Sequence, residues 1–115
     1  MRVGHEKDAV PIPQSKAGTT NTNLYKLITS DEGAISFSMR LISVLPGGHI
    51  GLHNHNYEHE VYVVRGKGLA QTDTENVEVG PGNTIFVPPN ETHGFTNTGD
   101  EPFEFICCIP KKEGI

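Results

Sequence analysis

Hydrophobic and polar residues alternate along much of this 115-residue chain. The longest such stretch, residues 35–45, places Ile35, Phe37, Met39, Leu41, Ser43 and Leu45 at odd positions, with Ser36, Ser38 and Arg40 between them. Successive side chains of a strand point to opposite faces, so this pattern predicts a half-buried strand whose odd positions face the core. No window of ten or more residues has a clean helical period, and we therefore expect an all-β protein.

Turn residues divide the remaining chain into short segments. Strands are expected at 24–28, 60–65, 84–87, 92–97 and 103–109, a hairpin at 69–79, and a short segment that follows a break at Pro46-Gly47-Gly48 and runs to His55. A sheet of eight or more strands does not stay flat and open, which predicts a closed barrel or a two-sheet jelly roll. Residues 11–23 show no period and are expected to be irregular, so we expect an N-terminal arm over 1–23, followed by a single domain over 24–115.

Composition narrows the possible partners. The net charge is −5 and the sequence pI is about 5.6, so no basic stripe is available to neutralise phosphates, and nucleic acid is not expected as a partner. No apolar run reaches the length of a membrane span or of a signal peptide, and we expect a cytoplasmic protein with no membrane partner. Cys107 and Cys108 are adjacent, so they should point to opposite faces of a strand and remain thiols.

The stretch HNHNYEH, residues 53–59, holds three of the six histidines. Side chains two positions apart on a strand share a face, so His53 and His55 can direct their ring nitrogens to one point. His59 follows after a gap short enough to bring the next strand alongside. His93 lies 34 positions beyond His59, after the turn at Pro88-Pro89-Asn90, and only a fold can bring it near the others.

Two spaced patterns resemble the sequence motifs of the cupin superfamily. Gly47-x5-His53-x-His55-x3-His59-x6-Gly66 is similar to the first cupin motif, and Gly82-x5-Pro88-x-Asn90-x2-His93-x3-Asn97 is similar to the second. The resemblance implies a cupin jelly-roll β-barrel and one divalent metal held by His53, His55, His59 and His93.

The chain departs from the first motif at His59, where cupins normally have Glu. Glu58 and Glu60 are one residue off, and a one-residue slip turns a side chain to the opposite face, so neither should replace His59 without a bulge. It departs from the second motif at Asn90, where cupins have Gly. Asn tolerates a positive backbone angle well, so the turn should survive.

The four-histidine variant, VPPNETHGF and the ending FICCIPKKEG together resemble small single-domain manganese-binding cupins of thermophilic microbes. Four neutral imidazoles would leave the full +2 charge on the ion, and an octahedral ion would keep two open positions for water, dioxygen or a bidentate anion. Imidazole also accepts Ni, Zn, Fe, Co and Cu, so manganese rests on the resemblance alone.

Strand parity suggests the pocket walls. Charged Glu104 marks the solvent face of the last strand, which turns Phe103, Phe105 and Cys107 inward. Phe105, Cys107, Phe95 and Ile50 are the predicted pocket residues, although plain core packing explains them equally well. Parity places Arg40 away from the apolar face. Ile50 occupies the position where oxalate-acting cupins commonly carry Arg, which favours a less polar substrate.

Two functions follow from the resemblance. The first is a metal-dependent, oxygenase-like enzyme that cleaves a C–C or C=C bond of a small organic substrate. The second is a non-catalytic module that binds or senses a small molecule, favoured by the absence of an evident general base in the motifs. A sugar epimerase would need a His/Tyr acid–base pair rather than four ligands. The exposed sheet edges and the N-terminal arm also predict a homodimer.

Overall fold

A computed structural model describes residues 1–111. Nine strands dominate it: β1 (Ile12–Gln14), β2 (Thr20–Ile28), β3 (Phe37–His53), β4 (His59–Arg65), β5 (Gly68–Gln71), β6 (Asn76–Val79), β7 (Thr84–Val87), β8 (His93–Asn97) and β9 (Phe103–Pro110). Three 3-10 turns join them: η1 (Glu6–Asp8), η2 (Lys16–Gly18) and η3 (Ser30–Glu32). None of these helical turns has the length to cross a membrane. The expected all-β fold is confirmed.

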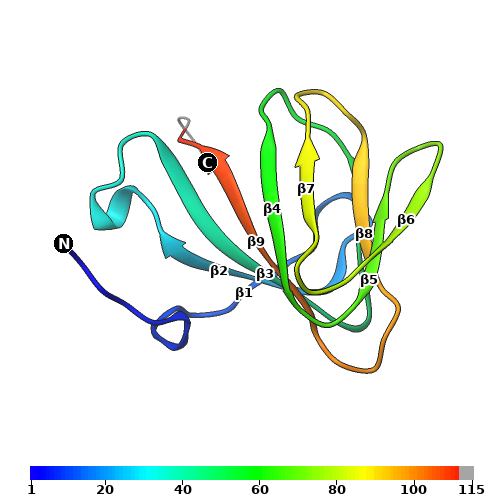
Figure 1. The fold of residues 1–115 in the computed structure, drawn as a ribbon, viewed down its shortest axis with the longest axis horizontal. Helices are drawn as coiled ribbons and strands as arrows, with labels where there is room; N and C mark the ends of the chain where they lie inside the picture. Colours follow the sequence, from blue (N-terminus) through cyan, green and yellow to red (C-terminus); the bar gives the residue numbers. More distant parts are fainter. Residues whose placement is uncertain (112–115) are drawn as a thin grey trace.

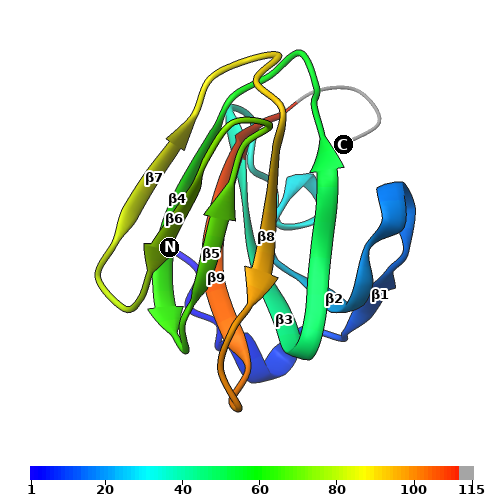
Figure 2. The ribbon, with the colours of Figure 1, turned by 90° about the vertical axis from the view of Figure 1, so that its right-hand side faces the viewer.

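The strands curl into a two-walled barrel (Figures 1 and 2). They pair in the order β6-β5-β8-β3-β9-β4-β7, and β1 and β2 branch off β3. All pairings are antiparallel. β3 belongs to both walls, because its first half pairs with β9 and its second half pairs with β8. This jelly-roll arrangement brings segments distant in sequence to the same cavity.

β3 is longer than its sequence suggests. Pro46-Gly47-Gly48 lies within its 17 residues and bends the strand without ending it. Gly47 supplies a φ of 79° at the bend, which costs glycine no steric strain. The break expected at this point is therefore a corner, and it lets one strand cross from the first wall to the second.

The even positions Arg40 and Ile42 of β3 face the histidine cavity, whereas the alternation had predicted that the odd positions face the core. The β3–β9 register pairs Arg40 with Cys107 and Ile42 with Phe105, so each pair shares a face, and β9 points Phe105 and Cys107 into the core. Phe37 at an odd position is 59% exposed. The expectation that Arg40 points away from the interior is wrong. The expectation that odd positions are buried holds for Leu41 and Ser43 but fails for Ile35 and Phe37, which are exposed.

The N-terminal segment is more ordered than an irregular arm. β1 lies at the edge beyond β2 (Figure 2), with which it pairs. The carboxylate of Glu6 in η1 lies 2.5 Å from the guanidinium of Arg65 on β4, which also binds Glu104 of β9 at 2.6 Å. η2 packs so closely over β3 that a Cβ at Gly51 would collide with the carbonyl of Ala17. Residues 11–23, expected to be irregular, thus include β1 and the start of β2.

The core is made by the inward residues of the two walls. Its aromatic part is a run of rings in which Phe103 and Phe105 have centroids 5.3 Å apart, and Phe105 and Phe95 are 4.7 Å apart. Val44, Val63 and Phe103 are fully enclosed. Above this apolar floor, toward the ends of β3, β4 and β8 that carry the histidines, the barrel interior becomes polar.

Candidate metal centre

Three histidines from different parts of the chain meet in the barrel. His53 ends β3, His93 begins β8, and the two are cross-strand partners. His55 follows β3, where the turn after β7 holds it: the backbone N–H of Asn90 donates to the carbonyl of His55 at 2.7 Å. Asn90 has the positive φ (68°) expected of it. The ligand nitrogens of His53, His55 and His93 lie within 4.8 Å of one another, close enough to hold one metal ion.

The backbone fixes the tautomer of each ring in this cluster. In each ring Nδ1 faces a backbone carbonyl. His53 Nδ1 lies 2.7 Å from the carbonyl of Gly51, His55 Nδ1 lies 3.0 Å from that of Tyr57, and His93 Nδ1 lies 2.8 Å from that of Glu91. A carbonyl only accepts hydrogen bonds, so Nδ1 carries the proton in the neutral form of each ring, which leaves the lone pair on Nε2. This is the arrangement that metal-binding imidazoles require.

His59 lies beside the cluster but is not one of its members. It is buried at the start of β4, and its ring stacks on that of His55 with centroids 4.3 Å apart and planes 12° from parallel. Its Nδ1 lies 2.9 Å from Sγ of Cys107. Glu58 and Glu60 on either side are exposed, so neither carboxylate faces the histidines.

Two buried ring nitrogens are left without hydrogen bonds. Within residues 1–111, Nε2 of His55 and Nε2 of His59 have no partner in the protein. A buried polar atom without a partner costs free energy that a bound ion would recover. The orphaned nitrogens, the three-histidine cluster and the neutral rings together fit a divalent transition metal.

Burial keeps the rings neutral. It lowers the pKa of His59 from 6.5 to about 3, and the neighbouring histidines and Arg40 add to the effect. Burial likewise lowers the pKa of His93 to about 4, against the opposing hydrogen bond to Glu91, and it lowers the pKa of His55. Protons therefore compete weakly with a metal for these nitrogens near neutral pH.

The histidines open into a cavity of about 520 Å³. All four predicted pocket residues line it: Ile50, Phe95, Phe105 and Cys107. The cavity also has walls that the sequence did not indicate, contributed by the N-terminal segment and by β2 and β3: Gln14, Lys16, Ala17, Thr19, Thr22, Leu24, Arg40 and Ile42. Tyr57 stacks on His55 at the same site, with ring centroids 4.1 Å apart.

Arg40 and Cys107 extend the site below His59. Nη2 of Arg40 donates to Sγ of Cys107 at 3.3 Å, so the sulfur links the guanidinium to the His59 ring. Burial raises the pKa of Cys107, which outweighs the opposite effect of Arg40. The residue is therefore a thiol in this environment.

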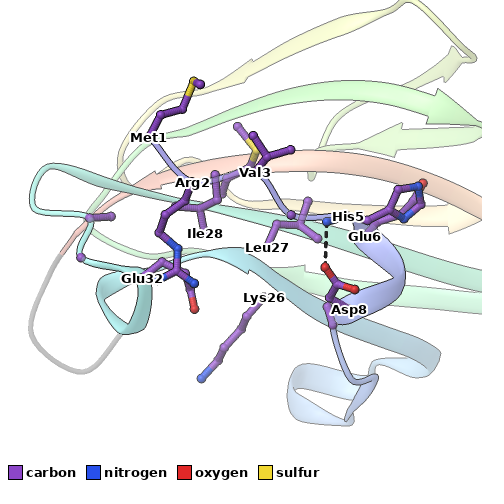
Figure 3. A pocket seen from close by; sticks show the side chains of 15 residues that line it. Met1, Arg2, Val3, His5, Glu6, Asp8, Lys26, Leu27, Ile28 and Glu32 are labelled. Carbon is purple, nitrogen blue, oxygen red and sulfur yellow. Dashed lines mark hydrogen bonds between the residues drawn. The ribbon is translucent and has the colours of Figure 1, made fainter.

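A second, larger cavity of about 690 Å³ lies away from the histidines, between the N-terminal segment, β2 and the turn that contains Glu32 (Figure 3). Its charged groups have mixed sign, and the hydrogen bond drawn there joins the backbone N–H of His5 to Asp8 within the arm itself. Met1 and Val3 on its rim are exposed. It offers no cluster comparable with the histidines.

Comparisons with known proteins agree with the fold. The family model described as "Cupin domain" matches residues 40–109. An oxalate-binding protein of Thermotoga maritima is 34% identical over 65 residues, which cover 56% of this chain and 54% of that protein. A glucose-6-phosphate isomerase of Thermococcus onnurineus is 43% identical over 58 residues, covering 46% and 31% respectively.

The chain thus spans about half or less of the length of these curated relatives. A solved structure matches over a greater length: the polyketide cyclase RemF of Streptomyces resistomycificus has a TM-score of 0.92 and 31% identity, covering 100% of this chain and 82% of that one. The matched domain includes the histidine cluster and all strands from β4 to β8. The chain belongs to the cupin family.

Proposed function

We propose that this protein is a divalent-metal-dependent oxidoreductase of the oxygenase type, which cleaves a C–C or C=C bond of a small organic substrate. The observation that carries the proposal is the set of three clustered imidazoles, each with Nδ1 directed at a backbone carbonyl, that line a cavity of small-molecule size. His59, with its unpartnered Nε2, is the fourth ligand in this proposal. Manganese is the expected metal because of the four-histidine resemblance.

An ion held by four neutral imidazoles supplies Lewis acidity and open coordination positions. The protein supplies the rest. The three Nδ1–H···O=C bonds hold the ligand rings in place, and the sulfur of Cys107 takes the corresponding position beside His59. Ile50, Phe95 and Phe105 form an apolar wall that orients a substrate and limits access of water.

Metal-assisted ring closure is a second candidate activity. The similarity to the polyketide cyclase over the whole of this chain favours it. Such a reaction needs a polarised carbonyl and no dioxygen. Non-catalytic binding of a small molecule is a third outcome, because no carboxylate lines the cavity in the described part of the chain to act as a general base.

One experiment separates these functions. The protein is purified with its native metal, the metal is quantified, and dioxygen consumption and product formation are followed with aromatic and enolic substrates. We expect wild type and Glu60→Gln, a change on the exposed face, to consume dioxygen, and His59→Ala to be inactive. Equal rates in wild type and His59→Ala would contradict the proposal. Product without dioxygen uptake would identify the cyclase, and binding without product would identify the binding module.

A further inference from the structure

Arg40 lies inside the barrel with unused hydrogen-bonding capacity. It lines the histidine cavity, and it is charged enough and near enough to lower the pKa of both His55 and His59. One of its five N–H donors reaches Sγ of Cys107. Its Nε is buried and has no partner anywhere in residues 1–111. A guanidinium that served only to hold the thiol would not leave this donor unsatisfied.

The cavity around Arg40 contains positive charge and no compensating negative charge. The chain has 14 Asp and Glu residues against 9 Lys and Arg, yet none of the acidic residues lines this cavity, whereas Arg40 and Lys16 do. The two ion pairs found among residues 1–111 both belong to Arg65, outside the site. A metal bound by neutral histidines would add further positive charge. A partly buried guanidinium with no acidic partner is only partly compensated, so the site is suited to an anionic ligand.

The cavity also has an apolar part. Leu24, Ile42, Ile50, Phe95 and Phe105 contribute side chains to it. A volume of about 520 Å³ accommodates a molecule considerably larger than a two-carbon dianion. The ligand that matches both parts has an anionic group and a hydrophobic body.

We propose that Arg40 binds an anionic oxygen group, a carboxylate or an enolate, of a substrate whose hydrophobic body packs against Ile50, Phe95 and Phe105. The guanidinium N–H groups that do not donate to Cys107 can donate to the oxygens of such a group, which gives orientation as well as charge. Lys16, exposed in η2 at the cavity, adds long-range attraction for the same charge. This assigns the substrate class and therefore rests on the function proposed above.

Arg40 also supplies the positive charge that is missing from the first motif, where Ile50 replaces an arginine. Ile50 stands where oxalate-acting cupins commonly carry Arg, which by itself indicated a less polar substrate. The structure keeps Ile50 as an apolar wall and introduces a cation from another part of β3, with its guanidinium beside Cys107 of β9. The substrate is consequently both anionic and hydrophobic.

The test uses benzoate and its neutral analogue benzamide as probes, titrated calorimetrically into metal-free and manganese-loaded protein. The metal-free titration isolates Arg40, because benzoate has no ion to bind there. We expect wild type to bind benzoate at least about tenfold more tightly than benzamide. Arg40→Gln should weaken benzoate binding by about 10- to 100-fold, the effect of losing a hydrogen bond to a charged group, with little change for benzamide.

Arg2→Gln is the matched control, since it removes the same charge from an exposed position outside the cavity. It should leave both affinities unchanged. Arg40→Gln should still bind one metal per chain, because it removes a cation and no ligand. Equal binding of benzoate and benzamide by wild type would overturn the proposal without requiring any variant to fold, and so would benzoate binding unaffected by Arg40→Gln.

The two proposals can fail separately. Arg40-dependent benzoate binding in a protein that consumes no dioxygen would contradict the oxygenase and leave the anion site intact. Dioxygen consumption that is unaffected by Arg40→Gln, with no preference for benzoate, would contradict the anion site and leave the metal chemistry intact. Arg40→Lys, which retains the charge without the planar fork, should bind benzoate with an intermediate affinity.

Discussion

Acidification should destabilise the metal-free protein steeply, because the folded chain buries histidines that resist protonation. The pKa values of His59 and His93 are about 3 and about 4 in the folded chain, and 6.5 is their ordinary value. A folded pKa below the unfolded one gives stability that is fully present above about pH 6.5 and is lost as the pH falls toward the folded values.

The magnitude follows from proton linkage. Between about pH 5.5 and pH 4.5 the unfolded chain holds nearly one more proton than the folded chain at each of the two rings. Each such proton lowers the free energy of unfolding by about 1.4 kcal/mol per pH unit, so the pair contributes about 2.7 kcal/mol per pH unit. A domain of this size has about 5–15 kcal/mol in total, so the metal-free protein should unfold in mildly acidic buffer.

Urea unfolding of the metal-free protein at several pH values measures this slope. His59→Gln removes one of the two rings and should reduce the slope by about 1.4 kcal/mol per pH unit, whatever the carboxylates contribute. Leu52→Gln, a change at an exposed position of β3 that adds and removes no titratable group, is the control and should keep the wild-type slope. A slope that is the same in wild type and His59→Gln would refute the reasoning, since it would mean that His59 is protonated as easily in the folded as in the unfolded chain.

Three further predictions concern the ligands, the packing and the assembly. His59→Ala should lower manganese affinity in a metal titration by at least about 10- to 100-fold, because losing a ligand should cost no less than losing a residue that orients one, whereas Glu60→Gln should not; equal affinities would remove His59 from the metal site. Gly68→Ala should cost about 1–3 kcal/mol in urea unfolding, because a Cβ there would lie 2.6 Å from ring carbons of Phe103; Gly80→Ala, with no neighbour closer than 4.0 Å, is the control, and equal effects would contradict the packing argument. The protein should be a homodimer by light scattering, since β1 has β2 as its only strand partner within the described residues and leaves an edge free, and a pure monomer would contradict this.

The sequence by itself determined which positions of the histidine segment face inward. From His53 to Val63 the odd residues are the more buried ones and the even residues are exposed, although residues 54–58 connect β3 to β4 and belong to no strand. The choice of His59 over Glu58 and Glu60 rested on the position of His59 in the first motif and on the opposite orientation of adjacent strand residues. The inward face of β9 and the positive backbone angle at Asn90 were readable for the same reason: both depend on local geometry.

Only the tertiary structure decided the face of Arg40. Leu41, Ile42, Ser43 and Val44 are all buried, so residues on both faces of this part of β3 are shielded from water, and its hydrophobic pattern cannot indicate which face is the interior. The register with β9 settles it by placing Arg40 opposite Cys107. Register depends on contacts between segments 67 residues apart, which no local pattern encodes.

The groups that hold the histidine rings in place could not be predicted from the sequence either. The carbonyls that fix the histidine tautomers lie only two residues from their rings, but every residue has a carbonyl, and only the folded backbone shows which ones turn toward Nδ1. The contribution of η2 to the cavity depends on its packing over Gly51. The sequence therefore determined the inward-facing histidines and the strand pattern, whereas the three-dimensional packing determined the charge and shape of the space around them.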